Sequence, residues 1–270
     1  MSHLDIAPFW VKPGAKPSLS DWDCEEHGGL EKAAGEAQLA SNLAALDELQ
    51  MKFWANRSRA LLIVLQGIDS AGKDGVIRRV ITALNPQGVI VHSFKKPSEA
   101  ESAHDYLWRV HSRCPAKGDI AVFNRSHYED IIVGHVHGTM DAETHAKRCR
   151  HIREFERMLT DEGTIVLKFF LAITKDEQLQ RLHERLDDPT KRWKFSINDM
   201  NERQRWSRYQ EVFESMLTET TTEHAPWMVV PANRKWFRNL LVSEVLLRTL
   251  TELQLDWPRP TSDLSQIRLR

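Results

Sequence analysis

An apolar run that ends in a glycine-rich loop constrains the fold more than any other feature of the sequence. Residues 60–67 read ALLIVLQG, and residues 67–75 read GIDSAGKDG. A continuous apolar run that ends in glycine is typical of a buried parallel strand, and a helical pattern follows the loop. Gly67, Gly72 and Lys73 have the GxxxxGK spacing of a P-loop. We therefore expect this loop to bind phosphate through its N–H groups, the helix N-terminus and the lysine.

Four further apolar runs alternate with helical patterns along the chain. Strands that alternate with helices predict a doubly wound parallel sheet with helices on both faces. Together with the strand before the loop, they predict an α/β P-loop kinase fold of three layers around a five-stranded parallel sheet. The further strands are expected at 89–92, 120–123, 164–170 and 227–230, with helices at 142–159 and 234–250.

The N-terminal residues differ in composition from the rest of the chain. Residues 1–29 are rich in Pro, Gly, Ser and Asp and predict an extended arm, anchored by Trp10 and Trp22. Residues 30–56 then carry apolar side chains at helical spacing and predict one long amphipathic helix. Residues 30–270 are expected to form a single domain. The long helix is available to a second copy, and we expect a homo-oligomer, either a dimer or a tetramer.

A segment without strand patterns follows the strand at 164–170. Residues 178–186 and 198–217 have helical patterns and are joined by the charged loop DDPTKRWKFS. A helical hairpin inserted after a strand predicts a lid, here over about residues 175–219. Trp193 in its loop is expected to pack against the domain.

Composition restricts the classes of function. The net charge is only −1, so a bound polyanion must meet a local cluster of Lys and Arg. The three widely spaced cysteines fit neither a disulfide framework nor a metal site, and the histidines at 135, 137, 145 and 151 have no metal-binding spacing. No apolar run approaches the about 18 residues of a membrane span. We expect a cytoplasmic protein that binds neither membranes nor nucleic acid.

The loop departs from the common P-loop pattern directly after its lysine. Asp74 stands where Ser or Thr commonly binds magnesium, so another group must hold the metal. Asp69 is the nearest carboxylate, and we expect it either to bind Mg²⁺ or to orient the acceptor phosphate. For Asp74 we favour a structural role, as a negative charge that stabilises the N-terminus of the helix.

A polar cluster follows the strand at 120–123, at the edge where open α/β sheets bind ligands. Arg125 is expected to bridge the donor and acceptor phosphates during transfer. Glu129 and Asp130 are expected to bind magnesium or the acceptor nucleotide; the alternative is that they only cap the next helix. The candidate phosphate- or nucleotide-binding residues are Gly67, Ala71, Gly72, Lys73, Asp74, Gly75, Asn124 and Asp130.

Several cations are placed to guide a polyanion to the loop. For each of them, the alternative to binding a polyanion is that it is only a solvated surface charge. Arg205 and Arg208 are expected on one helical face, as are Arg181 and Arg185. The further candidates are Arg78, Arg79, Lys95 and Lys96.

These motifs together resemble the polyphosphate kinase 2 family. GIDSAGKDG resembles its Walker A loop, FNRSHYED its Walker B-like segment, and RLHERLDDPTKRWKFS its lid. The resemblance extends over about residues 30–250 and implies a thymidylate-kinase-like fold. It also implies transfer of the terminal phosphoryl group of inorganic polyphosphate to a nucleotide, reversibly and with Mg²⁺ or Mn²⁺. It assigns functional roles to Asp69, Lys73, Arg125, Arg181, Arg185, Lys191 and Lys194.

The second motif resembles that of class III members, which accept both AMP and ADP. Asn124 stands where the diphosphate-specific members have an aspartate, so the metal is expected at Asp69 and Glu129. The expected catalytic set is thus Asp69, Lys73, Arg125 and Glu129, acting on adenine or guanine nucleotides. Two other functions share these features: an ATP-dependent nucleoside monophosphate kinase, and a non-catalytic protein that binds polyphosphate.

Overall fold

Five parallel strands form the centre of the structure, a computed structural model that describes residues 4–260, 262 and 267–268. The strand order is β2-β3-β1-β4-β5, and every neighbouring pair is parallel, so the predicted sheet is confirmed. The strand that precedes the P-loop is central. The strands are β1 (Ala60–Gln66), β2 (Val89–Ser93), β3 (Ile120–Asn124), β4 (Thr164–Ala172) and β5 (Trp227–Pro231).

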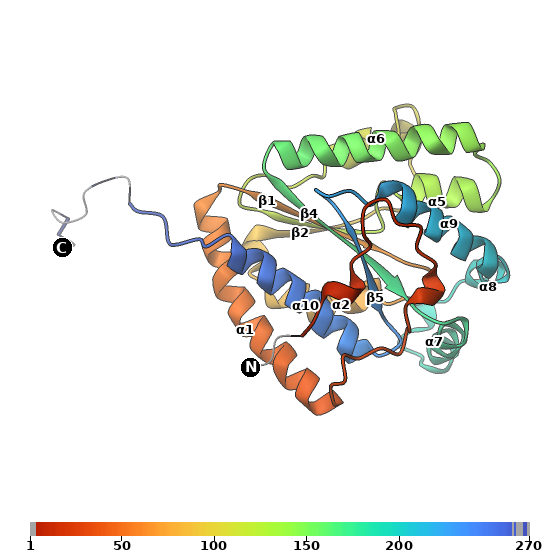
Figure 1. Cartoon of the computed structure of the whole chain (residues 1–270), viewed down its shortest axis with the longest axis horizontal. Coiled ribbons are helices and arrows are strands. Elements are labelled where there is room, and N and C mark those ends of the chain that lie inside the picture. The colour runs from red at the N-terminus through yellow and green to blue at the C-terminus, as the bar shows by residue number, and fades with distance from the viewer. Residues whose placement is uncertain (1–3, 261, 263–266, 269–270) are drawn as a thin grey trace.

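Helices cover both faces of the sheet. Figure 1 shows α1 and α10 on one face and α6 and α9 on the other, which gives the three predicted layers. No helix among the described residues is long and apolar enough to cross a membrane. The helices are α1 (Lys32–Asn56), α2 (Lys73–Arg79), α3 (Glu99–Ser102), α4 (Trp108–His111), α5 (Glu129–Val136), α6 (Ala142–Asp161), α7 (Lys175–Asp187), α8 (Ile197–Gln204), α9 (Trp206–Thr220) and α10 (Lys235–Glu252).

The central strand is buried along its whole length. Residues Leu61 to Leu65 are fully inaccessible, because helices cover both faces of the sheet. Each such side chain stabilises the fold by roughly 1.5–3 kcal/mol relative to exposure. The buried core therefore fixes the carboxyl end of β1, where the P-loop begins.

The long helix α1 packs within its own chain. Leu39, Leu46 and Phe53 form a buried stripe on α1, and this helix contacts α10 along its length. The apolar side of α1 is thus covered by α10 in the monomer.

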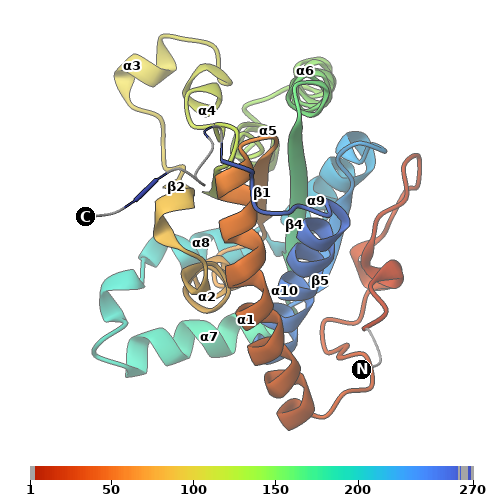
Figure 2. The same cartoon turned by 90° about the vertical axis from the view of Figure 1, so that its left-hand side faces the viewer.

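The N-terminal arm lies along the outer edge of β5. Trp10 forms an antiparallel bridge with Met228, and the N–H of Val11 donates to the carbonyl of Trp227 at 2.9 Å. Phe9 and Leu19 of the arm are buried. Figure 2 shows the arm on the β5 side of the molecule and α3 and α4 on the β2 side. The arm therefore covers the backbone groups of one edge strand.

The helix predicted at 198–217 is interrupted. Arg205 leaves helical geometry, with φ −89° and ψ 17°, and separates α8 from α9. The prediction that Arg205 and Arg208 share one helical face is therefore wrong. Val212, Phe213 and Met216 of α9 are buried against the domain. The packing predicted for Trp193 is also wrong, since this residue is 77% exposed.

Candidate active site

The P-loop lies at the carboxyl edge of the sheet, between central strand β1 and helix α2. Gly67 has φ 143° and Gly72 has φ 108°, which are conformations that glycine adopts readily. A Cβ atom on Gly67 would lie 2.7 Å from the carbonyl oxygen of Leu171. The glycine spacing is therefore needed for the loop to turn tightly beside β4.

Lys73 is the first residue of α2 and is buried. Its Nζ atom donates to the carbonyl of Gly67 at 2.6 Å and to that of Ile68 at 3.2 Å. Burial, followed by the charge of Arg125, lowers the pKa of Lys73 to about 8. The ammonium group thus folds back over the loop, and an anion bound there offers it stronger partners than these carbonyls.

Arg125 lies between two carboxylates at the mouth of the loop. Its guanidinium donates to Asp69 and, at 3.0 Å, to Oε2 of Glu129. Burial disfavours its charge, but Glu129 and Asp69 outweigh burial and raise the pKa of Arg125 above its ordinary value. The backbone of Arg125 is left-handed, with φ 63°, a strained conformation for a bulky residue. Three of the four predicted catalytic residues therefore meet in one cluster, which we call the site cluster (Asp69, Arg125 and Glu129).

The residues between Arg125 and Glu129 enter a second, buried cluster behind the site. Its members are His127, Tyr128, Glu156 and Lys168, and all are fully inaccessible. Lys168 Nζ lies 2.7 Å from Oε2 of Glu156, and the Tyr128 hydroxyl donates to Oε1 of Glu156 at 2.7 Å. Although burial opposes ionisation, the charge of Lys168 holds the pKa of Glu156 below its ordinary value. This buried cluster joins the segment after β3 to α6 and β4.

Asp74 connects the P-loop helix to β3 and to the predicted lid. Its Oδ1 accepts from Asn124 at 2.9 Å, and its Oδ2 lies 2.8 Å from Nζ of Lys194. These bonds to Lys194 and Asn124 lower the pKa of Asp74 despite the opposing effect of burial. Asp74 is in the first turn of α2, as predicted, but it also contacts a lid residue.

A cavity of about 1200 Å³ opens beside the site cluster. Asp130 is among the residues that line it; the Oδ2 atom of Asp130 is buried without a hydrogen-bond partner, while its Oδ1 lies 3.7 Å from Arg148. Burial raises the pKa of Asp130, against the charge of Arg148. The charged residues that line the cavity are Lys95, Lys96, Arg109, Arg125, Glu129, Asp130, Asp141 and Arg148.

The remaining predicted cations lie in different surroundings. Arg185 lies 3.3 Å from Asp199, and Lys191 lies 2.7 Å from Asp188. Arg78, Arg205 and Arg208 are exposed, and Arg208 pairs with Glu211. Arg181, in contrast, is buried under the P-loop. The structure therefore separates the predicted cations into a group at the site and a group on the surface.

The polar residues at the site include some that were not predicted, among them Arg238 and Gln66. Arg238 of α10 is 4% exposed and fills the space beside two P-loop glycines: a Cβ on Gly72 would lie 2.0 Å from its Nη1 atom. Gln66, at the end of β1, lies 3.1 Å from Oε1 of Glu129 when its amide is turned to satisfy both of its ends. Neither residue belongs to a motif, and only the position of Gln66 directly before Gly67 signals its role.

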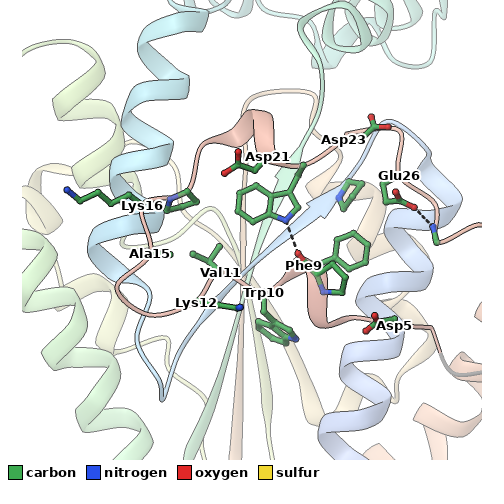
Figure 3. Close-up of a pocket in the computed structure, with 15 residues that line it drawn as sticks. Asp5, Phe9, Trp10, Val11, Lys12, Ala15, Lys16, Asp21, Asp23 and Glu26 are labelled. Carbon is green, nitrogen blue, oxygen red and sulfur yellow. Dashed lines mark hydrogen bonds between the residues drawn. The ribbon is translucent and has the colours of Figure 1, made fainter.

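A second hollow, of about 610 Å³, lies under the N-terminal arm and contains none of the predicted site residues. Figure 3 shows Phe9, Trp10 and Val11 at its wall, with Lys12 and Asp21 among the charged residues around it. Its lining comes from the arm and from Pro231. The hollow is therefore a feature of the arm, separate from the P-loop.

The carboxylates of the site supply oxygen ligands of the kind that Mg²⁺ prefers. No group of three or more His, Cys, Asp or Glu side chains is arranged to hold a metal within residues 4–260 and the other described positions. Magnesium in kinases commonly takes one or two carboxylates, with substrate phosphates and water as its other ligands. Asp69 and Glu129 therefore fit a metal that binds together with the substrate.

A lysine-bearing P-loop bonded to an arginine that lines a large cavity, at the carboxyl ends of parallel strands, defines a P-loop phosphotransferase. Residues 29–256 match the family described as "Polyphosphate kinase 2 (PPK2)". The chain belongs to the polyphosphate kinase 2 family.

Similar proteins cover nearly the whole chain. The AMP/ADP-polyphosphate phosphotransferase of Meiothermus ruber is 49% identical over 96% of this chain and 98% of its own length. The ADP-polyphosphate phosphotransferase of Rhodopseudomonas palustris is 40% identical over 94% of this chain and 92% of its own. The crystal structure of polyphosphate kinase 2 from Arthrobacter aurescens TC1 has a TM-score of 0.94 and 42% identity, and the match covers 98% of this chain and 96% of that one.

Proposed function

We propose that this protein transfers the terminal phosphoryl group of inorganic polyphosphate to AMP and to ADP. The observation that carries this proposal is the site cluster, in which Arg125 bonds to Asp69 of the P-loop that carries Lys73 and, with Glu129, lines a cavity of about 1200 Å³. The relative from Meiothermus ruber, named for both AMP and ADP, supports the choice of acceptors.

The cavity beside the site cluster suits the acceptor nucleotide. Its volume exceeds what a drug-sized ligand needs. Lys95 and Lys96 supply positive charge for the acceptor phosphates. Asp130 is also in the lining and its carboxylate repels phosphate, so we place a neutral part of the nucleotide on that side of the cavity, such as an exocyclic amino group or a ribose hydroxyl.

The P-loop suits the terminal phosphates of the donor. An oxygen of the acceptor phosphate attacks the terminal phosphorus of polyphosphate, a new P–O bond forms, and the bridging P–O bond breaks. The shortened chain leaves as a phosphate oxyanion, and no proton has to move. Lys73 and Arg125 neutralise the charge on the transferring group, with Arg125 between donor and acceptor.

Asp69 and Glu129 are the residues that would hold Mg²⁺. The ion supplies charge neutralisation at the phosphates. The ion pair between Arg125 and Asp69 is partly exposed, so the guanidinium can leave Asp69 to bind phosphate, and the carboxylate would then be available to the metal.

We propose a mobile lid that is narrower than the segment predicted from the sequence. One face of helix α9 is buried in the domain, whereas Leu186 at the end of α7 and Ile197 and Met200 in α8 are exposed large apolar residues. We therefore propose that residues 186–204 close over the site. Closure excludes water, which protects the donor from hydrolysis.

The test is a transfer assay with long-chain polyphosphate and Mg²⁺, with AMP, ADP, GMP and GDP as separate acceptors and no nucleoside triphosphate present. We expect ADP from AMP and ATP from ADP, and loss of both products in Lys73→Met. Activity only with a nucleoside triphosphate donor would show a nucleoside monophosphate kinase instead. Binding of polyphosphate without any transfer would show a non-catalytic binding protein.

A further inference from the structure

The first half of helix α7 contacts the back of the P-loop through backbone carbonyls. The side-chain amide of Gln178 donates to the carbonyl of Asp69 at 3.0 Å. Nη1 of Arg181 donates to the carbonyls of Ser70 and Ala71, both at 2.9 Å. Three consecutive carbonyls of the loop are therefore held by two side chains that lie one helical turn apart.

Arg181 has no N–H group left for a substrate. Its Nε donates to Glu177 at 2.6 Å, and its Nη2 donates to the carbonyls of Ala232 and Asn233 after β5. With the two bonds to the loop, the guanidinium makes five hydrogen bonds, as many as its N–H groups. The side chain is 6% exposed. A polyphosphate chain can reach this cation only if buried bonds break.

The geometry points to Arg181 and Gln178 as positioning residues that set the orientation of the P-loop amides. It does not make Arg181 a ligand of polyphosphate. In a trans peptide the C=O and the next N–H point in opposite directions. Fixing the carbonyls of Asp69 and Ala71 toward α7 therefore directs the N–H groups of Ser70 and Gly72 away from α7, toward the phosphate cradle.

The same contacts hold a strained residue in place. Ser70 has φ 71°, a left-handed conformation that costs free energy for a residue with a side chain. Such conformations persist where the surroundings enforce them, and the bond from Arg181 to the Ser70 carbonyl does so. Without this brace, we expect the loop to relax and its amides to lose their common direction.

The brace extends to the N-terminal arm. Asn233, whose carbonyl accepts from Arg181, donates through its side chain to Glu25 at 2.7 Å and through its backbone N–H to the carbonyl of Cys24 at 3.3 Å. The family match begins at residue 29, so these arm residues lie outside it. The arm is thus connected to the P-loop through two residues.

Arg185 provides a matched control, because it lies one turn further along α7 and its side chain is 23% exposed. The inference uses the proposed function for its activity readout. We would measure kcat and the KM for polyphosphate in Arg181→Lys, Arg181→Met and Arg185→Met, at two salt concentrations. Amide hydrogen exchange of a peptide over residues 60–76 reports the loop directly and needs no activity.

For the Arg181 variants we expect kcat to fall at least about tenfold, with a KM for polyphosphate within about twofold of the wild type. Lysine should not rescue, since it lacks the planar fork of donors. Exchange in the loop peptide should become faster. For Arg185→Met we expect the opposite result: the KM for polyphosphate rises and depends on salt, while hydrogen exchange in the loop peptide is unchanged.

A raised, salt-dependent KM with wild-type kcat and exchange in Arg181→Met would overturn the inference. If the Arg181 variants do not fold, Gln178→Met tests it, because it removes the bond to Asp69 and keeps the side-chain volume; Arg203→Met is its control, since it removes the other hydrogen bond of the Gln178 side chain. Wild-type kcat and exchange in Gln178→Met would likewise contradict the brace. Failure of the wild type to use polyphosphate would refute the proposed function, and hydrogen exchange would still decide the role of Arg181.

Discussion

The site cluster and the buried cluster share residues of one short segment, 125–129, yet their charges have opposite uses. In the site cluster, Arg125 pairs with carboxylates that are 17% and 30% exposed beside an open cavity. In the buried cluster, Lys168 and Glu156 are fully inaccessible and are also bonded to Tyr128. Partners that water and ligands can reach are exchangeable, whereas buried partners are permanent. Residues 125–129 thus combine charged groups that substrates can reach with side chains that are fixed in the core.

The largest expected effect comes from removing the exchangeable cation. Arg125→Met should lower kcat about a thousandfold or more, because a positioned arginine stabilises the charge of the transferring phosphoryl group. The midpoint of thermal unfolding should change little, since the pairs of Arg125 are partly solvated. Steady-state kinetics and a thermal melt of the same preparation check both parts. Retained turnover would show that Arg125 only orders the carboxylates.

The next effect comes from breaking the permanent pair. Glu156→Gln leaves the charge of Lys168 buried without a carboxylate and should lower the free energy of unfolding by about 3–5 kcal/mol. Urea denaturation measures this loss. Glu156→Leu combined with Lys168→Met removes both charges and should be less destabilised than the single variant. Equal stability of Glu156→Gln and the wild type would contradict the distinction between the two clusters.

The pH dependence of the reaction tests the charge of Lys73. The pKa of this lysine is about 8 in the free enzyme, so protons leave it as the pH rises through that value. We expect kcat/KM for polyphosphate to fall above this pH by about tenfold per unit, since kcat/KM reports the free enzyme. Bound phosphate favours the ammonium form and should move the decline of kcat to higher pH. The decline should be absent in Lys73→Arg; if it persists there, another group titrates.

The smallest effect is expected at the contact between the lid and the P-loop. Lys194→Met removes the ion pair with Asp74, whose side chain is 57% exposed. Exposed pairs contribute up to about 1 kcal/mol, so the KM for polyphosphate should rise by less than about fivefold. Lys191→Met, which breaks a pair within the lid loop, is the control and should have a smaller effect. A larger effect in the control would place the donor along Lys191.

Much of the fold could be predicted because each strand is an apolar run between turn signals. The meeting of Asp69 with Arg125 also follows from the sequence, since the carboxyl ends of neighbouring parallel strands share one edge. The break at Arg205 has no glycine or proline to mark it. Helical spacing predicted that Arg181 points toward the site, but it carried no information on how deeply the side chain is buried. The buried Arg181 and the more exposed Arg185 were therefore indistinguishable in the sequence.

The contacts of Arg238 were beyond prediction for a different reason. This residue reaches the P-loop from α10, far along the chain, and its sequence neighbours form no motif. Only the packed structure brings its guanidinium against Gly72. Burial, together with the charge of Arg181, lowers the pKa of Arg238 to about 10. Such long-range contacts depend on tertiary packing, which periodicity does not encode.

At Arg125 the left-handed backbone lowers the stability of the protein, whereas the side chain serves catalysis. A strained conformation of this kind costs about 1–3 kcal/mol, which glycine would largely recover. Glycine would also delete the guanidinium between the two carboxylates. A laboratory evolution experiment that rewards only survival of heating should therefore enrich Arg125→Gly, and the survivors should be inactive. Engineering a more durable catalyst from this chain requires that position 125 be held constant.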